Sequence, residues 1–313
     1  MDLNILITGS EGYIGQRLIS ALADNYKIVG VDIRPPSKQL YPYYEMDIRD
    51  AQLSDVMAKH NITHVVHLAS VMQASDDRAR DYDIDVNGTA NVLNCCINNQ
   101  VKHITVTSSG AAYGYHADNP DWLNEQAPLR GNDHFAYSQH KRLIEEMLVE
   151  YRVTHPALHQ LVLRPGTVLG KHTNNQITHL FTKSKLLGIK GSPSPFVFIW
   201  DEDVVKVITK GVTESLTGQF NLAGDGAMTM AEIAHVLNKP LMQVPAAVIA
   251  GILKIGHALG LTQYSAEQVD FLRYRPVLDN RALKTVFGYV PQKTSREVFD
   301  FYVAHNSHVR NSR

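Results

Sequence analysis

Two side chains near the middle of the chain have the spacing of a proton-transfer pair. Tyr137 and Lys141, in the stretch YSQHK, are four residues apart in a segment with helical spacing, so both point to one face of one helix. An ammonium group beside a phenol favours the phenolate and lowers the tyrosine pKa from its usual value of about 10. A tyrosine tuned in this way can exchange a proton with a carbinol oxygen near neutral pH.

A hydroxyl that could hold the same oxygen lies upstream, in the stretch TVTSSGAAYG at residues 105–114. Ser108 and Ser109 follow a short apolar run, so they stand at the end of a predicted strand. A tyrosine and a lysine at this spacing also occur by chance as a surface pair on a helix. Their position after the two serines and after a candidate cofactor loop favours a catalytic site, in which a nicotinamide exchanges a hydride with the carbon.

The candidate cofactor loop is the stretch NILITGSEGYIG at residues 4–15. Gly9 allows a sharp turn after the first strand, Gly12 lets the backbone approach a pyrophosphate, and Gly15 lets the next helix pack closely. The free N–H groups and the positive dipole end of that helix then hold the diphosphate. The loop therefore predicts a dinucleotide site.

Asp32 ends the second strand-like run, KIVGVDIR, seventeen residues after Gly15. A carboxylate there accepts hydrogen bonds from the adenosine ribose and repels a 2′-phosphate, which predicts NAD rather than NADP. Arg34 leaves NADP open, because its guanidinium could reach such a phosphate. The structural alternative for Asp32 is a solvated charge at a strand end.

The elements that must position these residues alternate through the first half of the chain. Short apolar runs separated by helical segments predict an α/β fold with a Rossmann-type doubly wound parallel sheet. The expected strands are Leu3–Thr8, Lys27–Asp32, His64–Leu68, His103–Thr107 and His159–Leu163. The expected helices are Tyr13–Asp24, Ala51–His60, Val86–Asn99 and Tyr137–His155.

Beyond Gly170 the pattern becomes turn-rich and then mostly helical. We expect a dinucleotide-binding domain at residues 1–170 plus 196–223 and a smaller, mostly helical substrate-binding domain at 171–195 plus 224–313. The apolar part of residues 241–261, Val244 to Leu253, is far shorter than the roughly 20 residues that a membrane span needs. It predicts a buried or lid helix and no membrane partner.

The bulk composition excludes several classes of protein. The chain has 313 residues, 44% of them hydrophobic, and a net charge of -1, so it can bury a large core and shows no basic excess for nucleic acid. The N-terminus has no export signal, which predicts a cytoplasmic protein. His60, His64 and His67 share no evident face, so no metal site is expected.

The motifs together resemble the extended short-chain dehydrogenases/reductases of the NAD-dependent epimerase/dehydratase group. The matching stretches are TGSEGYIG (8–15), Asp32, MDIRD (46–50), HLAS (67–70), DVNGT (85–89), SSGAAYG (108–114), YSQHK (137–141), LRPGTVLG (163–170), FIWDEDVVKVI (198–208), FNLAGDGAMTMAEIAHVL (220–237) and FGYVPQKTSREVFD (287–300). The resemblance covers nearly the whole chain and implies the fold, an NAD cofactor and a homodimer.

The resemblance also implies roles for individual residues. Tyr137 would be the acid/base, Lys141 would also bond the nicotinamide ribose, and Ser109 matches the catalytic Ser/Thr better than Ser108. The cofactor would contact Gly9, Gly12, Tyr13, Ile14 and Gly15 in the loop, Asp32, Ile33 and Arg34 at the ribose, Asp47 and Ile48 at the adenine, Leu68, Ala69 and Ser70 under its middle, and Pro165 and Val168 at the nicotinamide end, with Asn87 supporting the site from behind.

Two departures from the family narrow the activity. Its dehydratases carry an acid pair after the catalytic Ser/Thr, and Gly110 and Ala111 stand there instead, so dehydration is not expected. Its nucleotide-sugar epimerases usually carry an Asn soon after the arginine of the sixth strand, and PGTVLG follows Arg164. This departure and the apolar stretch Val244–Leu253 weaken the nucleotide-sugar assignment, because a sugar diphosphate needs polar and cationic partners.

Three hypotheses stay open. The first is an NAD-dependent epimerase of a sugar or nucleotide sugar, which oxidises a carbinol and returns the hydride to the other face of the ketone. The second is an NAD(P)-dependent dehydrogenase/reductase of a less polar alcohol or ketone. The third is a non-catalytic NAD-binding subunit, against which the intact Ser109, Tyr137 and Lys141 argue.

Overall fold

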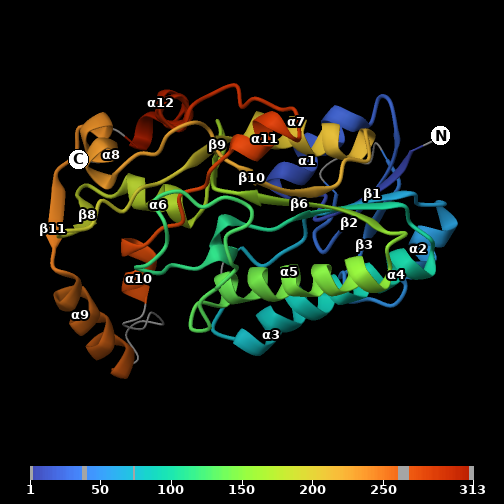
Figure 1. Cartoon of the computed structure of the whole chain (residues 1–313), viewed down its shortest axis with the longest axis horizontal. Helices are drawn as coiled ribbons and strands as arrows, with labels where there is room; N and C mark the ends of the chain where they lie inside the picture. The colour runs from blue at the N-terminus through green and yellow to red at the C-terminus, as the bar shows by residue number, and fades with distance from the viewer. Residues whose placement is uncertain (1–2, 37–40, 73–74, 260–267, 310–313) are drawn as a thin grey trace. The chain divides into compact units, whose positions relative to one another are not determined.

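The computed structural model describes residues 3–36, 41–72, 75–259 and 268–309 and divides into two compact units. The first unit comprises residues 1–109, 140–164 and 202–220, and the second comprises 110–139, 165–201 and 221–313. The predicted dinucleotide-binding domain includes 110–139, 165–170, 196–201 and 221–223, whereas these residues group with the second unit. Figure 1 labels the elements of both units.

A seven-stranded sheet forms the centre of the first unit, in the strand order β10-β6-β5-β4-β1-β2-β3. The strand pairs β1–β2, β1–β4, β2–β3, β4–β5 and β5–β6 are all parallel, as the continuous apolar runs of the sequence predict. The strands are β1 Asn4–Thr8, β2 Lys27–Asp32, β3 Tyr43–Glu45, β4 His64–His67, β5 His103–Thr107, β6 His159–Pro165 and β10 Gly218–Leu222.

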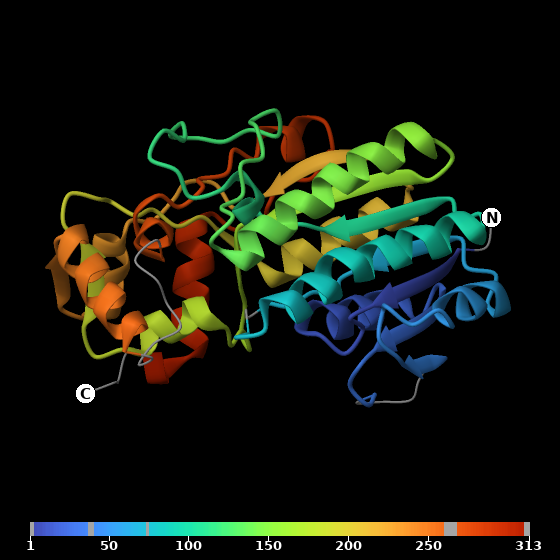
Figure 2. The ribbon, with the colours of Figure 1, turned by 90° about the horizontal axis from the view of Figure 1, so that it is seen from below.

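Helices cover both faces of this sheet. The helices α4 (Gly88–Asn98) and α5 (Ala136–Thr154) lie on one face, and α1 (Tyr13–Leu22) and α7 (Asp201–Thr213) lie on the other (Figures 1 and 2). On the first face, α2 (Leu53–Lys59) completes a core with α4, α5 and the strands. The sheet therefore has both faces buried, as in doubly wound folds.

The segment before α4 differs from the expected helix Val86–Asn99. A short helix α3 (Arg78–Tyr82) leads into one π-helical turn, η1 (Asp83–Asn87), and only then does α4 begin. A π turn inserts one residue into the helical repeat and is often found at functional sites. Here it contains Asp85, a carboxylate that is only 2% exposed.

The second unit is built from short strands and helices around its own core, which gathers aromatic side chains such as Phe181, Phe198 and Phe299. Its strands pair as β7 with β9 and as β8 with β11. The elements are η2 Gly110–Tyr113, β7 Thr167–Leu169, α6 Gln176–Thr182, β8 Leu186–Ile189, β9 Phe198–Trp200, α8 Met230–Leu237, β11 Leu241–Val244, α9 Ala246–Ala258, α10 Gln268–Arg273, α11 Arg281–Thr285, α12 Ser295–His305 and η3 Ser307–Val309.

Candidate active site

The predicted cofactor residues of the first unit lie at the carboxyl ends of parallel strands. Gly9 follows β1, Ile33 and Arg34 follow β2, and Asp47 and Ile48 come soon after β3. The stretch Leu68–Ser70 follows β4, and Ser109 comes two residues after β5. The strand order reverses between β1 and β4, and in open α/β sheets the crevice outside that point is where ligands bind.

The glycine positions of the loop between β1 and α1 have no room for a side chain. Gly9 has φ +69°, and a Cβ there would stand 2.8 Å from the backbone nitrogen of Ala69. A Cβ on Gly15 would stand 2.3 Å from the carbonyl oxygen of Gly9. Gly12 is the N-cap of α1, and no side chain caps that helix end. The bare backbone and the uncapped helix start fit a diphosphate.

Asp32 is held at the end of β2 by the loop and by Arg34. Its Oδ2 accepts a hydrogen bond from the Glu11 N–H at 2.9 Å, and both of its oxygens accept from the Arg34 guanidinium at 3.1 Å. The Asp32 side chain is 4% exposed, whereas that of Arg34 is 57% exposed. Asp32 is therefore fixed next to the glycine loop, and Arg34 is the more exposed of the two partners.

The residues predicted to line the rest of the cofactor differ in how they are held. Arg49 donates to Asp47, which lowers the pKa of that carboxyl, and Ile48 is buried against Gly88. Ala69 donates from its N–H to the hydroxyl of Thr8 at the end of β1. Asn87 is exposed on η1, and its amide donates to Asp83 rather than pointing into the fold.

Lys141 reaches the end of β5 from α5. Its ammonium is buried and donates to the carbonyl oxygen of Thr107 at 3.1 Å. Burial lowers the pKa of Lys141, although the charges of Asp85 and Glu145 raise it in part. Tyr137 lies one turn earlier on the same helix and is half-buried. The first four residues of α5, with Tyr137 among them, group with the second unit, whereas Lys141 groups with the first.

The two serines after β5 have different surroundings. The Ser108 hydroxyl is buried and donates to Glu145 at 2.5 Å, and Glu145 forms a buried ion pair with Arg164 at 2.6 Å. Ser109 is half-buried. Because the Ser108 hydroxyl is committed to a carboxylate, Ser109 stays the better candidate for a substrate oxygen.

The sequence analysis did not single out a buried carboxylate and imidazole next to Lys141. Asp85 on η1 contacts His140 on α5 at 2.9 Å, and both side chains are at most 3% exposed. The other Asp85 oxygen accepts from the Ser70 hydroxyl at 3.1 Å and from the Val71 N–H at 2.8 Å. A sequence signal existed, because polar residues at 140, 141 and 145 interrupt an otherwise buried helix face.

In the second unit, Pro165 is the last residue of β6, and Val168 lies on β7, where it pairs with Ile199 of β9. The same unit contains a cation that the sequence analysis missed. The Arg275 guanidinium lies 4.0 Å from the ring centroid of Phe196 and 4.3 Å from that of Phe271. Its Nε and one Nη are buried without a hydrogen-bond partner among the described residues. Burial lowers the pKa of Arg275 to about 10, so it keeps its charge near neutral pH.

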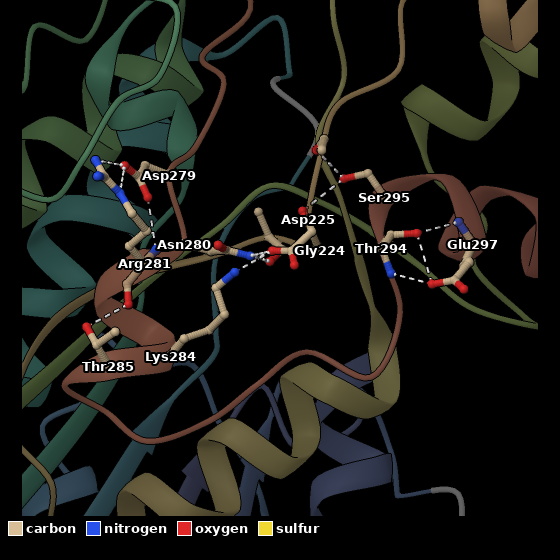
Figure 3. A network of polar contacts seen from close by, with 12 residues as sticks. Gly224, Asp225, Asp279, Asn280, Arg281, Lys284, Thr285, Thr294, Ser295 and Glu297 are labelled. Atoms are coloured by element: carbon tan, nitrogen blue, oxygen red, sulfur yellow. Dashed lines mark hydrogen bonds and ion pairs between the residues drawn. The ribbon is translucent and has the colours of Figure 1, made fainter.

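A second polar cluster in the second unit lines a pocket of about 450 Å³. Figure 3 shows its charges meeting one another: Asp225 binds Lys284 and the Asn280 amide, and Asp279 binds Arg281. These pairs tie the segment after β10 to α11. Because the charged groups of the pocket bind one another, we assign them a structural role. Within the described ranges, no group of three or more His, Cys, Asp or Glu side chains could hold a metal ion.

Comparison with known proteins agrees with this arrangement. The model of the NAD dependent epimerase/dehydratase family matches residues 5–197. The chain is 31% identical over 183 residues to N-acetyl-alpha-D-glucosaminyl-diphospho-ditrans,octacis-undecaprenol 4-epimerase of Escherichia coli O157:H7, covering 58% of this chain and 53% of that enzyme. It is 28% identical over 191 residues to UDP-glucose 4-epimerase of Neisseria meningitidis, covering 56% of each.

Solved structures show the same fold over the full length. The Bordetella bronchiseptica enzyme WbmG in complex with NAD and UDP superposes with a TM-score of 0.76 at 20% identity, covering 100% of this chain and 97% of that one. The matches to the two curated enzymes, in contrast, span only about half of each enzyme's length.

Proposed function

This chain belongs to the NAD-dependent epimerase/dehydratase family of extended short-chain dehydrogenases/reductases, and on that premise we propose that it epimerises a sugar carried on a diphosphate. The observation that carries the proposal is the buried Lys141 ammonium at the end of β5, one helical turn after Tyr137. The E. coli relative acts on a lipid-linked sugar diphosphate and the Neisseria relative on UDP-glucose, and both carriers contain a diphosphate.

The residues present fit an NAD molecule at the carboxyl edge of the sheet. The uncapped start of α1 would hold the diphosphate, and Asp32 would accept hydrogen bonds from the adenosine ribose. When it is bound, NAD supplies the acceptor and the donor for the hydride. Asp32 also favours NAD over NADP, because its charge repels a 2′-phosphate.

The chain's own residues would carry the proton. Tyr137 would take the proton from the sugar hydroxyl when the carbinol is oxidised, and would return it when the ketone is reduced from its other face. Lys141 would stabilise the phenolate, and Ser109 would donate a hydrogen bond to the same oxygen. Gly110 and Ala111 have no ionisable side chain, so the site lacks an acid for dehydration.

Arg275 supports an anionic substrate. A buried guanidinium with free donors is costly unless an anion pairs with it, and a diphosphate oxygen is such an anion. Phe196 and Phe271 contact the flat faces of the guanidinium, so an anion would have to pair with the N–H groups at its edge. We expect Arg275→Gln to raise KM for a diphosphate-linked sugar about tenfold or more, with little change in NAD affinity.

A second candidate is an NAD-dependent dehydrogenase of a less polar alcohol or ketone. The observation that favours it is the exposed apolar face of α9 in the second unit. A third is a non-catalytic NAD-binding subunit. We also propose the homodimer and the cytoplasmic location that the sequence predicts. Among the described residues, no helix is long and apolar enough to cross a bilayer.

The test is an incubation of the purified chain with NAD and a panel of UDP-sugars and polyprenyl-diphosphate sugars. An epimerase converts one sugar into its epimer without net accumulation of NADH, whereas a dehydrogenase accumulates NADH with substrate. Tyr137→Phe should lower either activity about a thousandfold and leave NAD binding intact. Unchanged activity in Tyr137→Phe, or no conversion of any sugar, would contradict the proposal.

A further inference from the structure

The helix α9 in the second unit is apolar on two opposite faces. Its inner face packs Ile249, Leu253 and two alanines against Ile189 of β8 and Val269 of α10. The expectation of a buried helix from the sequence therefore holds for this face. A helix that is apolar all round is normally covered on every side.

The outer face of α9 is uncovered by the described residues. Val248, Ile252, Ile255 and Leu259 follow one another at spacings of four, three and four residues, which places them in one stripe. These four side chains, called here the outer stripe, are 49%, 65%, 63% and 66% exposed. A Cβ added to Gly251 would meet no atom within 4 Å, which agrees with open space on this side.

The strand β11, which leads into α9, and its partner β8 each carry a further exposed apolar side chain. Met242 of β11 and Leu187 of β8 are direct cross-strand partners, and they are 50% and 38% exposed. The helix itself follows β11 at the margin of the second unit, with α10 beside it (Figure 1). A stripe of exposed apolar side chains such as that of α9 marks an interaction surface rather than an ordinary protein surface.

The segments that contain β8, β11 and α9 carry lysines and no acidic residue, whereas Asp270 stands on the neighbouring helix α10. Residues 171–200 and 233–266 contain no aspartate or glutamate, although the whole chain carries a net charge of only -1. The lysines of these two segments are Lys171, Lys183, Lys185, Lys190, Lys239 and Lys254. All of them except Lys239 are exposed. Lys190 donates from its backbone to Val244, directly before α9.

We propose that the outer stripe of α9 docks the protein on an anionic lipid bilayer, with the helix lying in the plane of the interface. An apolar helix face flanked by lysines is the pattern of such interfacial helices. With 13 residues, α9 is too short to span the bilayer, so the association is with the surface. The proposal departs from the expectation of no membrane partner, which considered only a spanning helix.

The proposed function gives this surface a use. A sugar linked through a diphosphate to a polyprenol stays at the membrane, and an enzyme docked there meets it without extracting the lipid. This step rests on the proposed function, whereas the docking itself needs neither NAD nor a sugar. A vesicle assay therefore tests the docking separately.

The experiment is flotation of the full chain with vesicles of phosphatidylcholine, with and without phosphatidylglycerol. We expect binding to the vesicles that contain phosphatidylglycerol, weaker binding in high salt, and a loss of affinity of about a hundredfold in the double variant Ile252→Glu, Ile255→Glu. The matched control is Val290→Glu, which changes a side chain that is 66% exposed outside this surface and should bind as the wild type does.

Three results would overturn the proposal. The first is a wild-type chain that does not float with anionic vesicles, and the second is a double variant that floats as well as the wild type. The third is a wild type that binds no vesicles and sediments as a dimer, with a double variant that sediments as a monomer, because a second copy of the chain would then cover the stripe. Melting curves of both variants check that the exposed substitutions leave the fold intact. A catalytically active chain that does not bind vesicles would leave the proposed function standing.

Discussion

The Nδ1 atom of His140 lies 2.9 Å from Oδ2 of Asp85, and the two side chains are 3% and 1% exposed. Asp85 comes from the π turn before α4, and His140 directly precedes Lys141 on α5. The other oxygen of Asp85 holds the segment after β4 through Ser70 and Val71. One carboxylate thus ties together three segments of the candidate site.

We expect the activity of Asp85→Asn to be lost at a lower alkaline pH than that of the wild type. Burial by itself would raise the pKa of Asp85, but the His140 hydrogen bond and the Lys141 charge lower it below its usual value. The charged Asp85 in turn raises the pKa of Lys141, which burial lowers. Without that charge, Lys141 loses its proton at lower pH, so the alkaline limb of kcat/KM should move to lower pH.

The pH profile separates this electrostatic role from a structural one. Asparagine preserves the shape of Asp85 and can keep most of its hydrogen bonds, so the free energy of unfolding should fall by only about 1 kcal/mol. Asp85→Ala should cost about 3 kcal/mol, because it leaves buried polar partners unsatisfied. An alkaline limb that stays in place or moves to higher pH in Asp85→Asn would refute the coupling to Lys141.

Gly15→Ala should abolish NAD binding. The added Cβ would stand 2.3 Å from the Gly9 oxygen and 2.7 Å from the Ser10 oxygen, and both atoms are backbone that cannot rotate away. We expect the loop to be displaced and the free energy of unfolding to fall by about 2 kcal/mol. Calorimetric titration with NAD measures the first effect, and urea unfolding measures the second.

Gly251→Ala is the matched control, because its Cβ would meet no atom within 4 Å in the helix α9. Alanine at this half-buried helical position should stabilise the protein by up to about 1 kcal/mol and leave NAD affinity unchanged. Equal effects of the two substitutions would show that the close approach of the loop to α1 does not determine cofactor binding.

Asp32→Ser should shift the cofactor preference toward NADP. Loss of the carboxylate removes the acceptor for the ribose hydroxyls, which should weaken NAD binding about thirtyfold. It also removes the repulsion of a 2′-phosphate and releases Arg34, whose guanidinium binds both oxygens of Asp32. NADP should therefore bind more tightly to the variant than to the wild type, as titration with each cofactor would measure.

Arg34 supplies the control for this preference. In the double variant Asp32→Ser, Arg34→Gln, the gain in NADP affinity should disappear, because no cation remains to pair with the phosphate. A double variant that binds NADP as tightly as Asp32→Ser would show that Arg34 has no part in the preference.

The local signals of the sequence predict the central sheet well. The strands Lys27–Asp32 and His103–Thr107 are confirmed residue for residue, because buried parallel strands are continuous apolar runs that end in polar residues. The edge strand β3, Tyr43–Glu45, was not predicted, since it has three residues and no strand-like periodicity. The helix expected from Val86 begins two residues later, because the π turn comes first.

In the candidate site, too, the residues with local signals were predicted and those that depend on distant partners were not. The glycine loop and Asp32 could be read locally, because each role depends on neighbours within about 25 residues. Asp85 and His140 are 55 residues apart in sequence, and their pairing depends on how α5 packs beside η1. Arg275 lies outside any motif, and its role depends on aromatic rings from Phe196 and Phe271 around it. The sequence can mark polar positions such as His140 on a helix, but it does not show which distant residue each of them contacts.

The burial of His67 in a neutral form predicts how the free energy of unfolding depends on pH. The Thr89 hydroxyl donates its proton to the Asp85 carbonyl, so its oxygen accepts from Nε2–H of His67 at 3.1 Å. The other ring nitrogen then accepts from the Thr8 hydroxyl at 2.7 Å, which requires a neutral imidazole. Burial, and the charge of Lys141, lower the pKa of His67 from 6.5 to about 3 in the folded protein.

The unfolded chain therefore takes up this proton first as the pH falls. The contribution of His67 to stability is complete above pH 6.5 and falls by about 1.4 kcal/mol per pH unit toward the folded pKa of about 3. Urea unfolding at several pH values below 6.5 should show a shallower slope in His67→Gln, in which an amide can still donate to Thr89 and accept from Thr8. His172→Gln changes an exposed histidine and should keep the wild-type slope. If His67→Gln and the wild type lose stability in parallel below pH 6.5, then His67 is not the group that resists protonation.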